Sequence, residues 1–251
     1  MFIESIFRYP IKSVGSEDLV SVFLKTNKTL PWDRYWGITH EKSFIKKNSK
    51  SWLNPNTFSR CYNFKAFSAI SNKFDENSGQ MLLKHPNLTD FKFNIFKEND
   101  FSKLIYWLQN LCIENFPKPV DLFRSKKFGF TDTSYPSISL NFISSLNSLT
   151  EYSGFPVSKG RFRANIWISD SLPWQELNMI NKKIKIGKSV LQIIEPIVRC
   201  RTTEFSDKTG SKDLEILKIL SKFNDEIYFG VYCKVLNEGK ISVNDKLIIL
   251  E

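Results

Sequence analysis

The segment IVRCRTTEFSDKTG, residues 197–210, holds the residue types best suited to chemistry in this sequence. Cys200 lies between Arg199 and Arg201, and two threonines follow. A thiol acts as a nucleophile or as a metal ligand only in its thiolate form, which neighbouring cations stabilise. In a strand both arginines would point away from the cysteine, so a functional Cys200 requires a strand end or a loop. The alternative interpretation is a small buried apolar residue.

Three other segments place a cation or a hydroxyl beside the expected end of a strand. The residues are Lys12 and Ser13 in YPIKS, Asp33 and Arg34 in LPWDRYW, and Arg161 and Arg163 in RFRAN. Taken one by one, they are equally consistent with solvated surface charge. Taken together, Lys and Arg suit a phosphate group and a soft thiolate suits a transition metal. A phosphorylated pterin-type cofactor requires such a set.

The overall charge favours an anionic partner. The 251 residues carry a net charge of +10, and 41% of them are hydrophobic. Lysine is abundant along the whole chain, however, and there is no block of five like charges and no recognised nucleic-acid motif. We therefore expect a small anionic ligand and no nucleic acid.

Cysteine and histidine usage excludes several classes of site. The four cysteines are far apart and form no CxxC motif, which argues against a disulfide framework and a zinc site. The two histidines, His40 and His85, are too few for a multi-histidine metal cage and give little support to a Ser-His-Asp triad. No secretory signal and no apolar run of about 20 residues is present. We expect a cytoplasmic protein without a membrane span.

Hydrophobic periodicity predicts a mainly β chain with some helices, of the α+β class. Strands are expected in FIESIFRYP, KAFSAI and QMLLKH, and a hairpin is expected around Gly187 in residues 182–196. Helices are expected at 101–116, at 139–152, which Gly154 closes, and at 213–223. The simplest arrangement of the strands is a closed or nearly closed barrel.

The order of six segments along the chain resembles that of the MOSC family, the proteins similar to the C-terminal domain of molybdenum cofactor sulfurase. The segments are YPIKS, LPWDRYWGI, FTDTSYPSISL, RFRANIWI, IVRCRTTEFSDKTG and FGVYCKVLNEGKISVNDKL. Their order is similar to that in the mitochondrial amidoxime-reducing component and its bacterial relatives. The resemblance implies an N-terminal β-rich domain at 1–100 and a MOSC β-barrel domain at 101–251.

The resemblance also implies a molybdenum–pterin cofactor and assigns residues to it. Cys200, the cysteine of an RC-x-x-T-T motif, would be the molybdenum ligand and the catalytic residue. The cofactor-binding residues would be Lys12, Ser13, Arg34, Asp132, Ser134, Arg163, Asn165, Thr202 and Thr203. Adjacency suggests that Asp33 orients Arg34. Cys61, Cys112 and Cys233 are interpreted as structural.

Two departures from the family pattern fall in loops. Ala164 stands where relatives often carry proline, and Glu204-Phe205-Ser206 replaces a hydrophobic-Asp-Pro sequence. Both changes weaken the inference about the substrate more than the inference about the cofactor ligands. The sequence also lacks the cysteine cluster of a C-terminal iron–sulfur domain, so we expect electrons to come from a separate ferredoxin- or flavodoxin-like protein.

The resemblance implies an oxidoreductase that reduces N-hydroxylated or N-oxide-type small molecules. The alternative is a carrier of sulfur or of the molybdenum cofactor, without its own reductase activity. In that case Cys200 would hold a persulfide instead of a metal.

Overall fold

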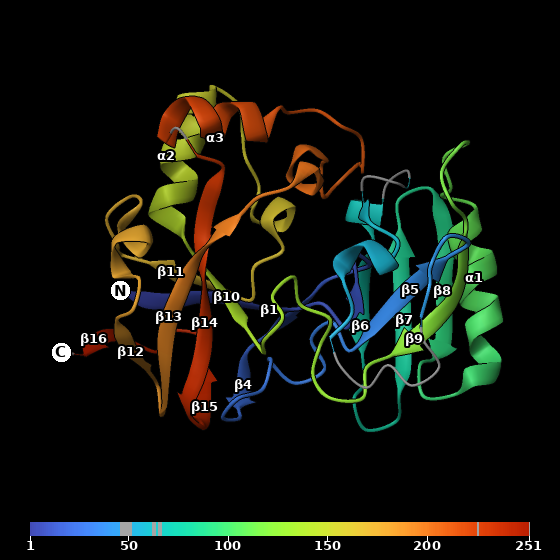
Figure 1. Ribbon diagram of the computed structural model, residues 1–251, viewed down its shortest axis with the longest axis horizontal. Helices are drawn as coiled ribbons and strands as arrows, with labels where there is room; N and C mark the ends of the chain where they lie inside the picture. The colour runs from blue at the N-terminus through green and yellow to red at the C-terminus, as the bar shows by residue number, and fades with distance from the viewer. Residues whose placement is uncertain (46–51, 62–63, 65–66, 225, 251) are drawn as a thin grey trace.

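The computed structural model describes residues 1–45, 52–61, 64, 67–224 and 226–250. These residues form two lobes that lie side by side, each with its own β-sheets (Figure 1). The larger lobe contains an eight-stranded sheet, and the smaller lobe contains two three-stranded sheets. The predicted class, mainly β with some helices, is confirmed.

The eight-stranded sheet combines both ends of the chain. In spatial order its strands are β16 (Leu247–Leu250), β12 (Lys183–Ile186), β13 (Ser189–Val198), β14 (Tyr228–Asn237), β10 (Ile138–Phe142), β11 (Ile166–Ser169), β1 (Phe2–Arg8) and β3 (Glu17–Leu19). Only β10 and β11 run parallel, and helix α2 (Ile143–Ser153) connects them as a crossover. Helix α3 (Ile216–Asn224) lies beside α2 on the same side of the sheet (Figure 1).

Of the expected closed or nearly closed barrel, the closed form is not found among the described residues. The outer edge of β1 is divided, because residues 6–8 pair with β3 while residues 2–3 approach the turn before β16. The second contact consists of an isolated bridge between Phe2 and Lys246, two backbone bonds between Ile3 and residues 244–245, and one backbone bond from Leu247 of β16 to the carbonyl of Met1. The two edges of the sheet therefore meet only through these few contacts, and the described strand order ends at β16 and β3.

The smaller lobe is built from three further groups of elements. One sheet contains β2 (Ile11–Lys12), β5 (Trp36–His40) and β9 (Pro119–Arg124), and the other contains β6 (Ser71–Phe74), β7 (Gln80–His85) and β8 (Leu88–Asn94). Helix α1 (Phe101–Gln109) packs against β9 and β8. A separate pair, β4 (Ser21–Leu24) with β15 (Gly239–Ser242), connects an early segment to a late one.

The short 3-10 helices lie mainly in the connections. They are η1 (Pro55–Thr57), η3 (Phe67–Ala69), η4 (Glu98–Asp100), η5 (Lys159–Phe162), η6 (Gln175–Met179) and η7 (Arg201–Glu204). The hairpin around Gly187 and the strand at 80–85 are confirmed. The strand predicted in KAFSAI is wrong, because its described part forms η3.

The helix predicted at 213–223 is confirmed as α3, and the other two predicted helices are shorter than expected. The helix at 101–116 ends at Gln109, and the helix at 139–152 begins only at Ile143 because residues 138–142 form β10. Gly154 closes α2 in the left-handed conformation, with φ 71°, as expected. The buried residues of β10 are apolar at every second position, so the strand pattern prevails over the helical one there.

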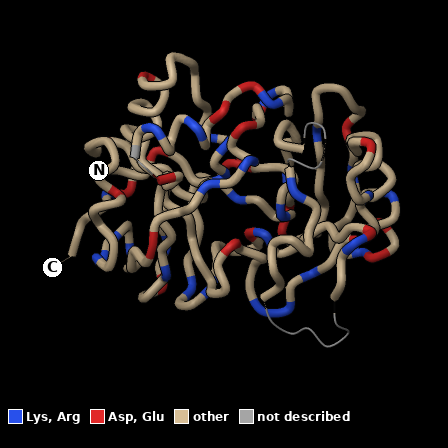
Figure 2. The backbone as a smooth tube through the Cα atoms, turned by 45° about the horizontal axis from the view of Figure 1, so that its top comes forward, with Lys and Arg blue, Asp and Glu red and all other residues tan. Residues whose placement is uncertain are grey.

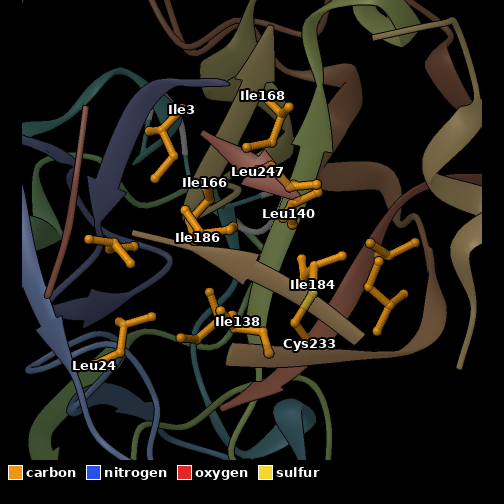
Figure 3. Packing of buried hydrophobic residues seen from close by; sticks show 14 of the residues in the cluster. Ile3, Leu24, Ile138, Leu140, Ile166, Ile168, Ile184, Ile186, Cys233 and Leu247 are labelled. Carbon is orange, nitrogen blue, oxygen red and sulfur yellow. The ribbon is translucent and has the colours of Figure 1, made fainter. Parts of the chain in front are cut away.

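Each lobe has its own apolar core. In the larger lobe the alternation of Ile184 and Ile186 on β12 places both against Ile138 and Leu140 of β10 (Figure 3). Burying each such side chain stabilises the fold by about 1.5–3 kcal/mol. The smaller lobe has a second cluster, centred on Trp36, among residues 11–122. The proposed domain division at residue 100 stays a prediction, and the eight-stranded sheet takes strands from both ranges.

One charged group in the larger lobe gives a pH-dependent prediction. Glu176 on η6 is fully buried, and its Oε2 accepts a hydrogen bond from Ser145 Oγ at 2.7 Å. Burial raises the pKa of Glu176 to about 7 from its ordinary value of 4.5. The folded state therefore favours the protonated form, and this contribution falls as the pH rises from 4.5 and is lost above about 7.

We expect Glu176→Gln to remove this pH dependence. Between about pH 5 and pH 8 the wild-type protein should lose about 2–4 kcal/mol of unfolding free energy that the variant keeps. Urea unfolding at the two pH values measures the difference. Glu151→Gln, at an exposed position on α2, serves as the control and should follow the wild type. A variant with the wild-type pH dependence would contradict the prediction.

Candidate functional site

A cavity of about 280 Å³ takes its walls from both lobes. Nine of the ten predicted site residues line it: Lys12, Ser13, Arg34, Asp132, Arg163, Asn165, Cys200, Thr202 and Thr203. The tenth, Ser134, is exposed and is not among the lining residues. Segments that are far apart in the sequence therefore meet at one place, as the predicted site requires.

Cys200 is exposed on the wall of this cavity, which excludes its interpretation as a buried apolar residue. It follows the end of β13 and precedes η7, so it occupies the strand end that a functional cysteine requires. Its carbonyl oxygen accepts hydrogen bonds from the backbone nitrogen of Thr203 at 3.1 Å and from Thr203 Oγ1 at 3.0 Å. The backbone of Cys200 is thus fixed while its side chain faces open space.

The two flanking arginines differ from the sequence interpretation. Arg199 is buried, and its guanidinium donates to the carbonyls of Phe229 at 2.7 Å and Phe162 at 2.9 Å, and to Asn141 Oδ1 at 3.0 Å. Burial lowers the pKa of Arg199 to about 10. The Arg201 side chain is 65% exposed, with Glu204 at 4.0 Å. Arg199 therefore anchors the strand that precedes Cys200, and Arg201 faces solvent.

Lys12 and Asp132 form an ion pair at the cavity. Lys12 Nζ lies 2.6 Å from Asp132 Oδ1 and also donates to the carbonyl of Phe130 at 2.8 Å. Burial lowers the pKa of Lys12 although Asp132 opposes the shift. Burial would raise the pKa of Asp132, but Lys12 and Arg34 outweigh it and hold that pKa at about 2. Because the Asp132 side chain is 60% exposed, solvent screens part of this attraction.

Arg34 and Arg163 lie over the ring of Tyr9. Their Cζ atoms are 4.8 Å and 4.3 Å from the ring centroid. Arg34 Nη2 donates to the carbonyl of Arg163 at 2.7 Å, and Arg163 Nη2 donates to the carbonyl of Gly15 at 3.1 Å. Asp33 is fully buried below them, where its carboxylate pairs with Arg34 and accepts from the Tyr9 backbone nitrogen at 2.8 Å. The expected orienting contact of Asp33 is confirmed.

Three lining residues adopt the left-handed backbone conformation, which residues other than glycine rarely adopt. Ser13, Arg34 and Arg163 have φ angles of 69°, 52° and 49°. The left-handed region costs free energy in residues other than glycine and is often found at functional sites. Here it turns three predicted cofactor-binding residues toward one cavity.

Asn165 and Thr203 have their polar groups occupied within the protein. Asn165 Oδ1 accepts from the backbone nitrogen of Ser139 at 3.1 Å and from Ser139 Oγ at 2.9 Å, and its Nδ2 donates to the Phe7 carbonyl at 3.2 Å. These bonds tie β10 and the residue before β11 to β1.

The cysteine motif of this chain is one residue shorter than the RC-x-x-T-T pattern of the family, since only Arg201 separates Cys200 from Thr202.

The cavity contains residues that the sequence interpretation did not assign to the site. They are Pro55, Arg60, Cys61, Thr131, Ser137, Ser139, Arg161, Phe162, Ile197, Val198, Arg199 and Tyr232. Strand alternation could have indicated Tyr232, because Val231 and Cys233 on either side of it face the apolar core. Cys61 lines the cavity in addition to packing in the smaller lobe, so its purely structural interpretation is incomplete. No sequence pattern indicated Cys61.

The charge of the lining is strongly positive. Lys12, Arg34, Arg60, Arg161, Arg163 and Arg199 contribute six cations, and Asp132 is the one carboxylate among the described lining residues. Within the described part of the chain, no group of three or more His, Cys, Asp or Glu side chains could hold a metal ion. None of the described helices is long and apolar enough to cross a bilayer.

Comparison with known proteins identifies the C-terminal half of this arrangement. Residues 133–248 match the family model described as the MOSC domain. This segment is a MOSC domain. A curated relative, the molybdenum cofactor sulfurase of Drosophila ananassae, is 34% identical over 94 residues, which cover 36% of this chain and 12% of that protein.

Two solved structures are also similar to the chain. The YUAD protein from Bacillus subtilis covers 98% of this chain and 93% of its own, with 10% identity and a TM-score of 0.44. YiiM from Geobacillus stearothermophilus covers 45% of this chain and 54% of its own, with 22% identity and a TM-score of 0.36.

The cavity is not confined to the MOSC domain. Cys200 and Arg163 belong to residues 133–248, whereas Lys12, Ser13 and Arg34 precede them. The thiol therefore comes from the MOSC domain, and much of the positive charge comes from the N-terminal part of the chain.

The ion pair below Tyr9 gives a stability prediction. Breaking a buried ion pair leaves an unpaired buried charge, so Asp33→Asn should lower the unfolding free energy by about 3–5 kcal/mol. Urea unfolding at neutral pH measures this loss. The matched control is Asp90→Asn, which removes the exposed pair with Lys84 and should cost less than about 1 kcal/mol. Equal losses in the two variants would contradict the assigned role of Asp33.

Proposed function

We propose that the cavity binds the molybdenum cofactor and that the protein is a molybdenum-dependent oxidoreductase. The observation that carries this proposal is an exposed thiol, Cys200, on the wall of a cavity lined by six cationic side chains. A thiolate is a suitable ligand for a transition metal, and guanidinium groups bind phosphate in a bidentate geometry. The name of the curated relative, a molybdenum cofactor sulfurase, is consistent with this ligand.

The chemistry of the lining fits the cofactor. The cations outnumber the one described lining carboxylate, and among the described residues the guanidinium of Arg163 donates to the Gly15 carbonyl and lies over the Tyr9 ring. An anionic group entering the cavity would replace solvent around these charges. The cavity volume is near the lower end of the range for small-molecule pockets. These features favour a compact, phosphorylated ligand over an extended polymer.

The residues divide into two roles. Lys12, Ser13, Arg34 and Arg163 would hold the phosphate end, and Cys200 would bind the metal. Asp132 would keep Lys12 in place through their ion pair. Thr203 and Asn165 would act through the backbone that they fix, and Thr202 lies at the same wall. We assign no cofactor contact to Ser134, which is exposed outside the lining.

The substrate class follows from the resemblance of the motifs. Reduction of an N-hydroxylated compound to the amine or amidine consumes two electrons and two protons and releases water. The bound cofactor supplies the redox chemistry of the oxygen-atom removal. The chain supplies a thiolate, a positively charged wall and restricted solvent access. Val198, which is 62% exposed and lines the cavity, would offer an apolar contact to the substrate.

A second candidate function is a carrier of sulfur or of the cofactor. Two observations favour it: the exposure of Cys200, which a persulfide would also require, and the name of the curated relative. In that case the cationic lining would bind the cofactor for transfer, without turnover of a substrate.

We expect molybdenum to bind in a one-to-one ratio and to depend on Cys200. Protein purified from cells that synthesise the cofactor should contain about one molybdenum per chain by plasma mass spectrometry. Cys200→Ser should lose most of this metal and the reductase activity toward an N-hydroxylated test compound, because the hydroxyl is a poorer ligand than the thiolate.

Cys112→Ser is the matched control, because Cys112 does not line the cavity and its loss should leave the metal content unchanged. Cyanide-labile sulfur without molybdenum would support the carrier function instead. Equal molybdenum in the wild type and in Cys200→Ser would refute the assigned metal ligand.

The electron donor is proposed to be a separate acidic protein of the ferredoxin or flavodoxin type. The net charge of +10 favours such a partner, and Figure 2 shows basic segments distributed over both lobes. We expect the apparent second-order rate constant for reduction of the protein by this donor to fall about tenfold when the ionic strength is raised from a low to a physiological value. Stopped-flow reduction measures it. A rate constant that does not change with salt would count against electrostatic recognition of the donor.

A further inference from the structure

Two of the four cysteines line the same cavity. Cys200 follows β13 of the eight-stranded sheet, and Cys61 belongs to the apolar cluster of the smaller lobe. Cys112 and Cys233 are not among the lining residues. The motif that resembles the family accounts for Cys200 alone. The second thiol is therefore a property of this chain that needs its own explanation.

The sulfur of Cys61 lies at the wall of the cavity that the N-terminal part of the chain contributes. Its Sγ donates a hydrogen bond to the carbonyl of Ser13 at 3.1 Å, next to the proposed phosphate end. Burial raises the pKa of the Cys61 thiol, and the positive charge of Arg163 opposes this shift. A sulfhydryl is a weak hydrogen-bond donor, so the bond to Ser13 does not prevent the sulfur from reacting.

The two thiols differ in their access to solvent. Cys200 is exposed, whereas Cys61 is only 2% exposed. A small oxidant in solution therefore meets Cys200 first. Cys200 also lies outside a strand, before a single 3-10 turn, so its side chain can turn toward the cavity without breaking a ladder of the sheet.

We propose that Cys61 and Cys200 form a reversible disulfide across the cavity when the protein encounters a peroxide. The disulfide would tie the smaller lobe to the MOSC domain and would withdraw the sulfur that the proposed function assigns to the metal. This consequence for metal binding rests on the proposed function, but the formation of the disulfide does not.

The reaction balances with hydrogen peroxide as the oxidant. The Cys200 thiol loses its proton, its sulfur attacks a peroxide oxygen and breaks the O–O bond, and the leaving hydroxide takes up that proton, which gives a sulfenic acid and one water. The sulfur of the Cys61 thiol then attacks the sulfenic sulfur, and the leaving hydroxide takes up the Cys61 proton as a second water. Two thiols are oxidised by two electrons in total, and one peroxide is reduced to two waters.

The geometric requirement makes the proposal testable. A disulfide joins residues whose Cα atoms lie within about 7 Å. Its formation would therefore also show that the two walls of the cavity approach each other to this distance.

The experiment uses the full-length, cofactor-free protein treated with one equivalent of hydrogen peroxide. Wild-type protein should lose two of its four titratable thiols and should yield a peptide that contains Cys61 linked to Cys200 in non-reducing mass spectrometry. A phosphine reductant should restore all thiols. In Cys61→Ser the reaction should stop at the sulfenic acid, which dimedone traps on Cys200. Cys112→Ser should behave as the wild type.

Three outcomes would overturn the proposal: equal dimedone labelling of Cys200 in the wild type and in Cys61→Ser, a Cys200 disulfide only between chains, or oxidation of neither thiol. The result is independent of molybdenum content, so failure of the proposed function leaves it unchanged. If both hold, the oxidised protein should take up no molybdenum cofactor until the disulfide is reduced. Uptake by the disulfide-bonded protein would then contradict Cys200 as the metal ligand but not the disulfide.

Discussion

Mutual repulsion among the cations around the cavity is the constraint on which the rest of the site depends. Side chains of like charge destabilise one another when they are brought together away from water. The fold offsets this cost with partners outside the open space: Asp33 for Arg34, Asp213 for Arg161, and backbone carbonyls for Arg199. Because the protein itself holds the cations in place, the cavity keeps a positive potential toward an anion that enters it.

The same partners account for the strained backbone of the site. The left-handed backbone conformation costs a residue other than glycine about 1–3 kcal/mol of folding free energy, and it persists only where contacts with the surroundings hold it. The hydrogen bond from Arg34 to the Arg163 carbonyl, and the stacking of both guanidinium groups on Tyr9, fix two such residues against each other. The buried carboxylate of Asp33 supports the Tyr9 backbone and Arg34 together. Strain and charge are thus offset by one connected group of contacts.

The sequence predicted the parts of the site that short-range chemistry specifies. Cys200 beside arginines and the cations of the N-terminal segments were recognisable from residue types, while the full set of ten site residues was implied by the resemblance to the MOSC family; nine of the ten line one cavity. Long-range pairing was not predictable: one edge of β1 is divided between β3 and a short contact with residues 244–247. Cys61 was not predictable either, because its position depends on packing between segments remote in the sequence. The chain forms a 3-10 turn at 67–69, where a strand was expected, because three apolar residues are too few to define a hydrophobic period.

The motif residues divide according to whether their polar atoms are already occupied. The side chains of Asn165 and Arg199 form hydrogen bonds with strands β1, β10 and β14 and with the carbonyl of Phe162. Cys200 keeps its thiol exposed while Thr203 binds its carbonyl. A reactive side chain needs neighbours that fix its backbone without contacting its functional atom. The RC-x-T-T sequence meets this need, since the Arg199 side chain fixes the position before the cysteine and Thr203 binds the carbonyl of the cysteine itself. The motif therefore specifies the contacts that fix the backbone of Cys200 as well as the thiol itself.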